Sequence, residues 1–260
     1  MQTHGTLSPL GQMVRRVDPD RFLTALFAPL ARREALFTLY AFNHELARAR
    51  EVVREPFAAL IRLQWWREVI QGAHRAHDVA GPVSDALKAG WLASADLEAM
   101  IAAREMEAEG FDTRADFETY VMGAAGGVMV AAGRALGMVA PESLRPWGAA
   151  YGVAGILRSV PAHARQGRCL LPLDMVREAG SSEGAVIAEP GSPTLGGIKD
   201  RLRGSAQAWL TEPVTVPRTA IAAALPAVLA RRDLRRTIAP KARPLRDKLS
   251  VIAAGLTGSI

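Results

Sequence analysis

Apolar residues recur along this chain at spacings of three and four, which is the period of an amphipathic helix. Phe22, Leu26 and Leu30 form one such stripe, and Leu39 and Leu46 belong to the next. Alternating apolar and polar runs, which indicate strands, are scarce. The pattern therefore predicts an all-α fold.

Prolines, glycines and small polar residues set the expected helix ends. The segment between Pro29 and Pro56 predicts one long helix that begins near Ala31, and Ser94 is the expected N-cap of a later one. Pro161 is expected to stop a helix. The stretch 181–197, rich in Gly, Ser and Pro, predicts a loop able to act as a lid. Further helices are expected over 56–72, 83–90, 94–110, 116–137, 141–160, 198–210, 217–236 and 245–256.

The expected helix over 116–137 is unusual because glycine weakens helices. Gly123, Gly126, Gly127 and Gly133 stand there among alanines. Such a composition is tolerable where neighbouring helices approach closely. We therefore expect this helix to be buried on most sides.

Length and composition favour one domain. The chain has 260 residues, of which 49% are hydrophobic and 22% charged, enough to bury a single core. We expect an N-terminal tail over 1–17 and a helical domain over 18–260. The single Cys169 cannot form an internal disulfide, and the sequence shows neither a signal peptide nor about 20 consecutive apolar residues. A cytoplasmic protein is expected, with peripheral association at the inner membrane as an alternative.

The net charge of +6 and a pI near 10.1 make anionic partners plausible. A solvated helix face is the plain interpretation of the basic C-terminal stretch, and contact with an anionic membrane is the alternative; nucleic acid is not expected as a partner. The basic residues of this stretch are Arg231, Arg232, Arg235, Arg236, Lys241, Arg243, Arg246 and Lys248.

Common catalytic motifs are missing from the sequence. It contains no G-x-G-x-x-G, no G-x-x-x-x-G-K loop and no G-x-S-x-G elbow. His74 and His77 could share a helix face but lack a third ligand at a zinc-site spacing. Nucleotide-binding folds and zinc enzymes are therefore not favoured.

Two segments, 20–51 and 151–175, carry arginines on and beyond a largely apolar helix face. In these segments the chain resembles the squalene/phytoene synthase family, whose members join two prenyl diphosphates head to head. The resemblance implies a single-domain, isoprenoid-synthase-like helical bundle with a central cavity, lined or backed by Tyr40 and Phe42. The matching pieces are Arg21-Phe22, Leu39-Tyr40-Ala41-Phe42, Gly155-Ile156-Leu157-Arg158 and Arg165-Gln166-Gly167-Arg168.

This sequence differs from the family pattern at the positions that bind metal in the family. Members hold magnesium with a D-x-x-x-D pair on each of two facing helices. The resemblance places the first pair on Ala47 and Glu51 and the second on Ser159 and His163, so one carboxylate of four remains. No catalytic residue, metal or cofactor is therefore expected. If the protein is active, Glu51 is the weak candidate for Mg²⁺ binding and catalysis.

Arginine side chains could neutralise a diphosphate without metal, because guanidinium forks match phosphate oxygens. This arrangement favours binding over ionisation of the allylic bond. The candidates for diphosphate or anion binding are Arg21, Arg48, Arg158, Arg165 and Arg168.

The departures resemble a non-catalytic branch of the family that includes an assembly factor for mitochondrial respiratory complex I. The leading hypothesis is a scaffold or assembly factor for respiratory complex I, with a respiratory-complex protein as partner. A divergent prenyltransferase that uses Glu51 and an isoprenoid or lipid-binding protein are the alternatives. The similar pieces are 41–47, 62–66, 157–163 and 171–175.

Overall fold

The computed structural model describes residues 7–53, 55–236 and 242–260, and these ranges contain helices and turns but no strand. The all-α prediction is confirmed. Within the same ranges, no helix combines the length and the apolar character that crossing a bilayer requires. The helices are α1 (Pro9–Val17), α2 (Pro19–Ala25), α3 (Leu30–Glu51), α4 (Pro56–Ile70), α5 (Ala80–Lys88), α6 (Ser94–Glu109), α7 (Arg114–Val121), the π segment η1 (Met122–Gly126), α8 (Gly127–Ala135), the 3₁₀ turn η2 (Pro141–Leu144), α9 (Arg145–Arg165), α10 (Leu173–Glu178), α11 (Glu183–Ala188), the 3₁₀ turn η3 (Pro193–Leu195), α12 (Gly196–Trp209), the 3₁₀ turn η4 (Arg218–Ala220), α13 (Ile221–Ala224), α14 (Pro226–Leu234) and α15 (Leu245–Thr257).

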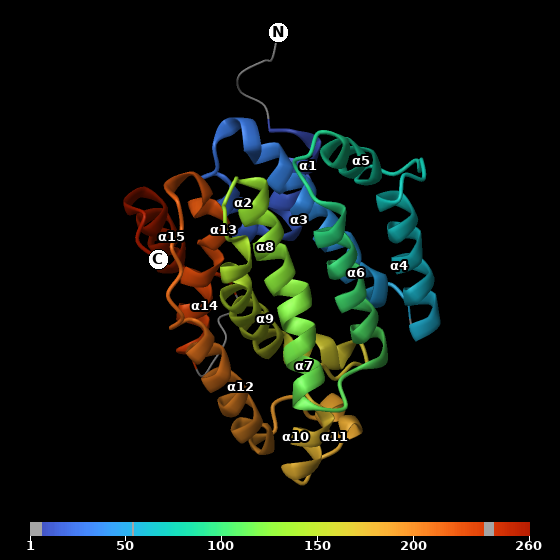
Figure 1. The fold of residues 1–260 in the computed structure, drawn as a ribbon. Helices are drawn as coiled ribbons and strands as arrows, with labels where there is room; N and C mark the ends of the chain where they lie inside the picture. Colours follow the sequence, from blue (N-terminus) through green and yellow to red (C-terminus); the bar gives the residue numbers. More distant parts are fainter. Residues whose placement is uncertain (1–6, 54, 237–241) are drawn as a thin grey trace.

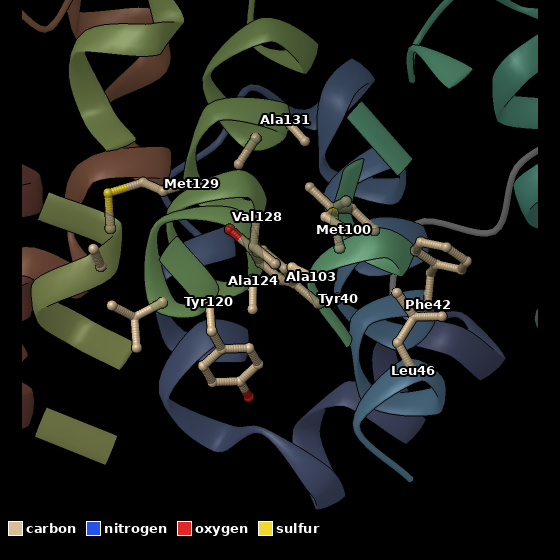
Figure 2. Close-up of a cluster of buried hydrophobic side chains, with 14 of the residues drawn as sticks. Tyr40, Phe42, Leu46, Met100, Ala103, Tyr120, Ala124, Val128, Met129 and Ala131 are labelled. Atoms are coloured by element: carbon tan, nitrogen blue, oxygen red, sulfur yellow. The ribbon is translucent and has the colours of Figure 1, made fainter. Parts of the chain in front are cut away.

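The helices form one bundle (Figure 1). In that view α8 and α9 lie in the middle, α4 and α6 on one side and α12 and α14 on the other. The core joins α3, α6, α7 and α8, whose side chains meet in Figure 2. Burial of these apolar side chains supplies most of the stabilisation of the fold. The core side chains labelled there include Tyr40, Phe42, Leu46, Met100, Val128 and Met129, all nearly inaccessible to solvent.

The glycine-rich segment does bring helices close together, as the sequence predicts. A Cβ atom on Gly123 would lie 2.8 Å from the Cβ of Ala103 in α6. A Cβ atom on Gly148 of α9 would lie 2.7 Å from both the carbonyl oxygen of Ala125 and the Cα of Gly126. Between α7 and α8 the helix widens into the π segment η1, a feature often found at functional sites.

Helix α9 does not stop at Pro161, and that prediction is wrong. It continues to Arg165 with the proline inside it. Proline inside a helix removes one backbone hydrogen bond and costs about 3 kcal/mol. Val160 and Ala164 are buried on either side of it, and this packing offsets the loss. The continuation keeps His163 on the same helix as Ser159.

The N-terminal segment is also more ordered than the expected tail. Residues from Pro9 onward form α1, which Ser8 caps by accepting a hydrogen bond from the backbone of Gly11. Leu10 and Val14 are buried and belong to the hydrophobic core. The described part of the expected tail therefore belongs to the helical domain.

Three further local predictions are wrong. Ser94 is the first residue of α6 and Ala93 is its N-cap. The stretch 181–197 contains α11 and η3, because Ser182 caps α11 and Val186 anchors it in the core. The expected helix 217–236 is divided into η4, α13 and α14, with Pro226 beginning the last.

Candidate functional site

A cavity of about 480 Å³ lies among α2, α3, α6, α7 and α9. Its wall includes Val121 of α7, Ala124 of η1, and Gly152, Gly155 and Ile156 of α9. Beside Gly155 there is open space, since a Cβ atom on it would meet no atom within 4 Å, whereas Gly152 lets α9 approach Ala125 closely. The cavity predicted from the sequence is therefore present, within the size range of small-molecule sites.

The four degenerate aspartate positions all line this cavity. Ala47 and Glu51 come from α3, and Ser159 and His163 come from α9. The two pair positions implied by the family resemblance thus face the same cavity. Together they supply one carboxylate, on Glu51, whose side chain is exposed.

A buried charge cluster forms the floor of the cavity. Glu107 of α6 is only 5% exposed. Its Oε2 atom lies 2.5 Å from Nη1 of Arg104, and its Oε1 atom pairs with Arg168. The hydroxyl of Tyr120 donates to Oε2 of Glu107 at 2.6 Å. All four side chains line the cavity. A single carboxylate is thus shared by two guanidinium groups and a phenol.

Electrostatics keep this cluster ionised. Burial alone would raise the pKa of the Glu107 carboxyl, but the positive charges of Arg104 and Arg168 and the hydrogen bond from Tyr120 lower it to about 2. Burial raises the pKa of Tyr120, so its hydroxyl keeps the proton it donates. Glu107 is therefore a carboxylate already bound to cations of the protein itself.

His163 presents a neutral ring to the cavity. Burial, followed by the positive charge of Arg168, lowers the pKa of its imidazole to about 4. Among the described residues, none hydrogen-bonds its buried Nδ1 atom. Where the family has an aspartate, this chain thus has an uncharged group at neutral pH.

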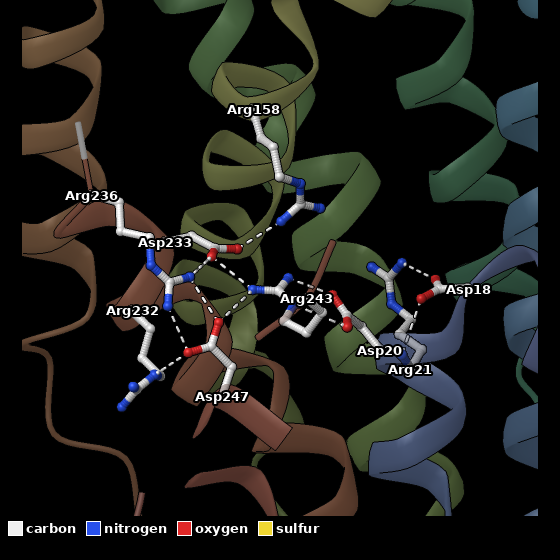
Figure 3. A network of polar contacts seen from close by, with 9 residues as sticks. All are labelled: Asp18, Asp20, Arg21, Arg158, Arg232, Asp233, Arg236, Arg243 and Asp247. Atoms are coloured by element: carbon white, nitrogen blue, oxygen red, sulfur yellow. Dashed lines mark hydrogen bonds and ion pairs between the residues drawn. The ribbon is translucent and has the colours of Figure 1, made fainter. Parts of the chain in front are cut away.

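A second set of ion pairs joins the cavity wall to the C-terminal helices (Figure 3). Arg21 pairs with Asp18 at 2.9 Å. Arg243 lies 2.5 Å from Asp20 and 2.7 Å from Asp233. Asp18, Asp20, Arg21 and Arg243 all line the cavity, so the acidic groups on this side are also neutralised by arginines.

The network in Figure 3 corrects the plain interpretation of the basic C-terminal stretch. Asp247, whose side chain is fully buried, lies 2.6 Å from both Arg232 and Arg236. Although burial would raise the pKa of Asp247, hydrogen bonds from these two arginines lower it. Part of the stretch is therefore internal rather than a solvated face, while Lys241 lies outside the described residues.

Of the other arginines expected at the site, one lines the cavity and two do not. Arg158 lines the cavity and pairs with Asp233 at 2.7 Å, but Arg48 pairs with Glu45 at 3.3 Å and is not part of the cavity wall. Arg165 is exposed and also absent from that wall.

Tyr40 and Phe42 do not line the cavity either, because both are buried in the core. Tyr40 backs the wall indirectly, with the guanidinium of Arg21 lying 5.8 Å from its ring centroid.

The buried cluster was not found from the sequence, although one signal for it exists. Met100, Ala103 and Glu107 share one face of α6 at spacings of three and four, and the first two are core residues. A charged residue at such a core position needs a partner. Tyr120 fits an ordinary apolar stripe, and Arg243 lies far from the cavity in sequence, so neither gave a comparable signal.

These residues do not fit a cluster of magnesium ions. Magnesium in proteins is held by carboxylates together with phosphate oxygens and water. Three of the cavity's carboxylates, on Asp18, Asp20 and Glu107, are bound by arginines, and Glu51 stands without a second carboxylate at its pair position. Among the residues that the structure describes, no three His, Cys, Asp or Glu side chains are arranged to hold a metal ion.

Comparison with solved structures identifies the class of fold. A dehydrosqualene synthase in complex with ligand is 16% identical with a TM-score of 0.75, and the match covers 96% of this chain and 94% of the other. The squalene synthase HpnC of Alicyclobacillus acidocaldarius is 17% identical with a TM-score of 0.63, and the match covers 96% and 92%. The fold is that of a helical isoprenoid synthase.

The chain belongs to the squalene/phytoene synthase family, whose sequence model matches residues 14–252. The predicted family is thereby confirmed. Among curated relatives, the human "NADH dehydrogenase (ubiquinone) complex I, assembly factor 6" is 25% identical over 181 residues, which cover 66% of this chain and 54% of that protein. Its Drosophila melanogaster homologue is 27% identical over 189 residues, covering 67% and 57%. The chain thus spans about half the length of these relatives.

Proposed function

We propose that this protein is a non-catalytic member of its family that acts as a scaffold in the assembly of respiratory complex I. The observation that carries the proposal is the state of the cavity: the two facing pair positions supply only Glu51, and the other lining carboxylates are bound by arginines. The names of the curated relatives support the assembly role.

The physical argument concerns the leaving group. Ionisation of a prenyl diphosphate develops negative charge that cations must stabilise, and several acidic side chains are needed to gather such cations. In this cavity the charge of Glu107 is neutralised by two side chains of the protein itself, Arg104 and Arg168. These arginines are consequently engaged with the protein and only partly available to a diphosphate.

An activity assay tests the absence of catalysis. The purified chain is incubated with Mg²⁺ and farnesyl or geranylgeranyl diphosphate, beside a squalene synthase as positive control. We expect no pyrophosphate release above the background without protein. Steady release together with a coupled C30 or C40 product would overturn the proposal.

Deletion of the gene in its native organism tests the assembly role. We expect less assembled complex I on native gels and lower NADH:quinone oxidoreductase activity, with succinate dehydrogenase unchanged as the control. The wild-type chain and Glu51→Gln should both restore complex I. Restoration by the wild type alone would favour the divergent prenyltransferase, and unchanged complex I in the deletion strain would contradict the scaffold.

A bound amphiphile is a second candidate function, favoured by the mixed wall of the cavity. Val121, Ile156 and Leu170 provide apolar surface, and Arg168 lies beside them. Such a wall suits a ligand with an apolar chain and an anionic head. Native mass spectrometry of protein purified without detergent should find a co-purified lipid or isoprenoid, whereas an empty protein that also fails to bind added long-chain prenyl phosphates would exclude this function.

A further inference from the structure

The last helix, α15, carries an apolar stripe on its outer face. Leu245, Leu249, Ile252 and Leu256 recur at spacings of four, three and four, so they share one side of the helix. Leu245 is 70% exposed, Leu249 53% and Leu256 66%, and Ile252 is half-buried. The inner side of α15 is buried through other residues, with Val251 fully inaccessible. The stripe is therefore additional to the packing that holds the helix in place.

The exposed charges beside this stripe are positive. Arg235 after α14 and Arg246 and Lys248 of α15 are exposed. The acidic side chains of the two helices, Asp233 and Asp247, are 7% and 0% exposed and are bound by arginines. The pairing of α14 with α15 thus hides its negative charges and presents cations to solvent.

A second hollow, of about 390 Å³, lies between α14 and α15. It is lined by Arg231, Arg232 and Arg235, and by the hydroxyl-bearing side chains of Ser250 and Thr257. The two hydroxyls donate to the carbonyl oxygens of Arg246 and Ala253, and Arg232 also pairs with Asp247. The groove therefore offers guanidinium groups, whose forks match phosphate oxygens.

One arginine of the groove is fixed in position by its neighbours. The guanidinium of Arg231 lies 5.0 Å from the ring centroid of Trp147 and donates to the carbonyl oxygen of Leu210 at 3.0 Å. Burial, followed by the positive charge of Arg235, lowers the pKa of Arg231. An anion in the groove would relieve this repulsion between cations.

The apolar stripe and the groove are placed around α15 as the apolar face and the polar flank are in a helix that lies on a membrane surface. Successive residues of a helix are rotated by about 100°, so Ser250 and Thr257 lie on the flank of α15, about a third of a turn from the leucines. Arg246 lies on that same flank and Lys248 on the opposite one. When such a helix lies flat on a bilayer, its apolar side enters the acyl boundary and its flanking cations reach the phosphates.

We propose that α14 and α15 form a docking face for a membrane surface that contains anionic phospholipids. Leu245, Leu249 and Leu256 enter the interface, and the groove between the two helices binds a lipid phosphate. The composition of α15 fits a bilayer surface: its exposed side chains are leucines, the cations Arg246 and Lys248, and the small residues Ala253 and Thr257. Leucines on one face with Lys and Arg beside them are typical of interfacial helices. Figure 1 places α15 at the outer edge of the bundle, on the opposite side from α4.

Vesicle co-sedimentation tests this inference independently of the function proposed for the cavity. The full chain is mixed with vesicles of phosphatidylcholine containing 30% phosphatidylglycerol, with pure phosphatidylcholine, and with free phosphate as a competitor. We expect binding to the anionic vesicles, weaker binding in 0.5 M salt and little effect of free phosphate. Each removed cation near the surface should weaken binding about fivefold, so Arg235→Gln/Arg246→Gln should lower it roughly 25-fold.

A matched pair of apolar variants locates the contact. Leu245→Ser/Leu249→Ser/Leu256→Ser should reduce binding at least about tenfold. Phe57→Ser/Ile61→Ser changes side chains of α4 that are 72% and 56% exposed, and it should leave binding unchanged. Equal binding by the leucine variant and the wild type, or no binding by the wild type, would overturn the proposal. A dimer in light scattering that the leucine substitutions dissolve, without vesicle binding, would show a second copy as the occupant and likewise overturn it.

Discussion

Arg243 binds Asp20 across 223 positions of sequence, with its Nη2 atom 2.5 Å from Oδ2 of the aspartate. Its Nη1 atom also lies 2.7 Å from Asp233, so one guanidinium joins α2 to α14 and α15 (Figure 3). The side chains of Asp20 and Arg243 are 16% and 11% exposed. The N-terminal wall of the cavity is thereby tied to the C-terminal helices.

We predict that Arg243→Gln lowers the free energy of unfolding by about 3 kcal/mol, because it leaves Asp20 and Asp233 with fewer cationic partners in a nearly buried site. Chemical denaturation followed by circular dichroism measures the change. Arg201→Gln is the matched control, since the pair of Arg201 with Glu178 is 46% and 65% exposed. That control should shift stability by less than about 0.5 kcal/mol. Equal effects of the two variants would contradict a special role for Arg243.

Because folding lowers the pKa of Glu107, we expect the free energy of unfolding to depend on pH. The pKa of this carboxyl falls from an ordinary 4.5 to about 2 on folding, so the unfolded chain takes up the proton first as the medium is acidified. The stabilisation is complete above pH 4.5 and disappears as pH falls toward 2. Its size is on the order of 3 kcal/mol.

Denaturation series between pH 7 and pH 2.5 measure this contribution. We expect Glu107→Gln to be less stable than the wild type at pH 7 by about 3 to 5 kcal/mol, because two buried arginines lose their partner. The difference in free energy of unfolding between Glu107→Gln and the wild type should become smaller below pH 4. Tyr120→Phe removes the hydrogen bond that the hydroxyl donates to Glu107 and the one that it accepts from Arg104, and leaves the ion pairs of Glu107 in place. It should lower stability by about 1 to 2 kcal/mol and serves if the first variant does not fold. A gap independent of pH would refute the assigned charge state.

Local sequence patterns predict much of the fold. Helical periodicity identified α3, and the family resemblance indicated Ala47, Glu51, Ser159 and His163, which all line one cavity. The family resemblance was needed for this last step, because periodicity alone does not say which two helices face one another.

The interactions that decide the character of the site are long-range, and the sequence does not reveal them. Arg168 meets Glu107 across 61 positions, and Arg243 meets Asp20 across 223. Apart from Glu107, which lies on the core face of α6, each of these residues looks like an ordinary surface charge in its own segment. Pro161 failed as a helix stop for a similar reason, since the tertiary packing of Val160 and Ala164 outweighs the local preference.

The close approach of α9 to η1 predicts opposite effects for two glycines of the same helix. Gly148→Ala would place a Cβ atom 2.7 Å from backbone atoms of Ala125 and Gly126, and it should destabilise by about 1 to 3 kcal/mol. Gly155→Ala meets no atom within 4 Å and should stabilise by about 0.5 to 1 kcal/mol, because alanine favours the helix. Thermal denaturation distinguishes the two signs. Destabilisation by both would mean that helix propensity does not govern position 155.

Restoring the lost carboxylates should create a cation site from the existing geometry. In Ala47→Asp/Ser159→Asp/His163→Asp, three aspartates join Glu51 around one cavity. Without metal, their mutual repulsion should lower stability relative to the wild type. Mg²⁺ should then raise the midpoint of thermal unfolding of this variant and not that of the wild type, because an ion that binds only the folded state stabilises it.

Calorimetric titration of both proteins with Mg²⁺ gives the binding constants directly. The matching amide variant, Ala47→Asn/Ser159→Asn/His163→Asn, has nearly the same shape without the charge and controls for the added volume. If Mg²⁺ stabilises the wild type as much as the aspartate variant, Glu51 and the other cavity carboxylates already hold the ion, and the non-catalytic proposal loses its main support. If only the aspartate variant responds, the loss of three acidic side chains is sufficient to explain why this cavity does not gather metal ions.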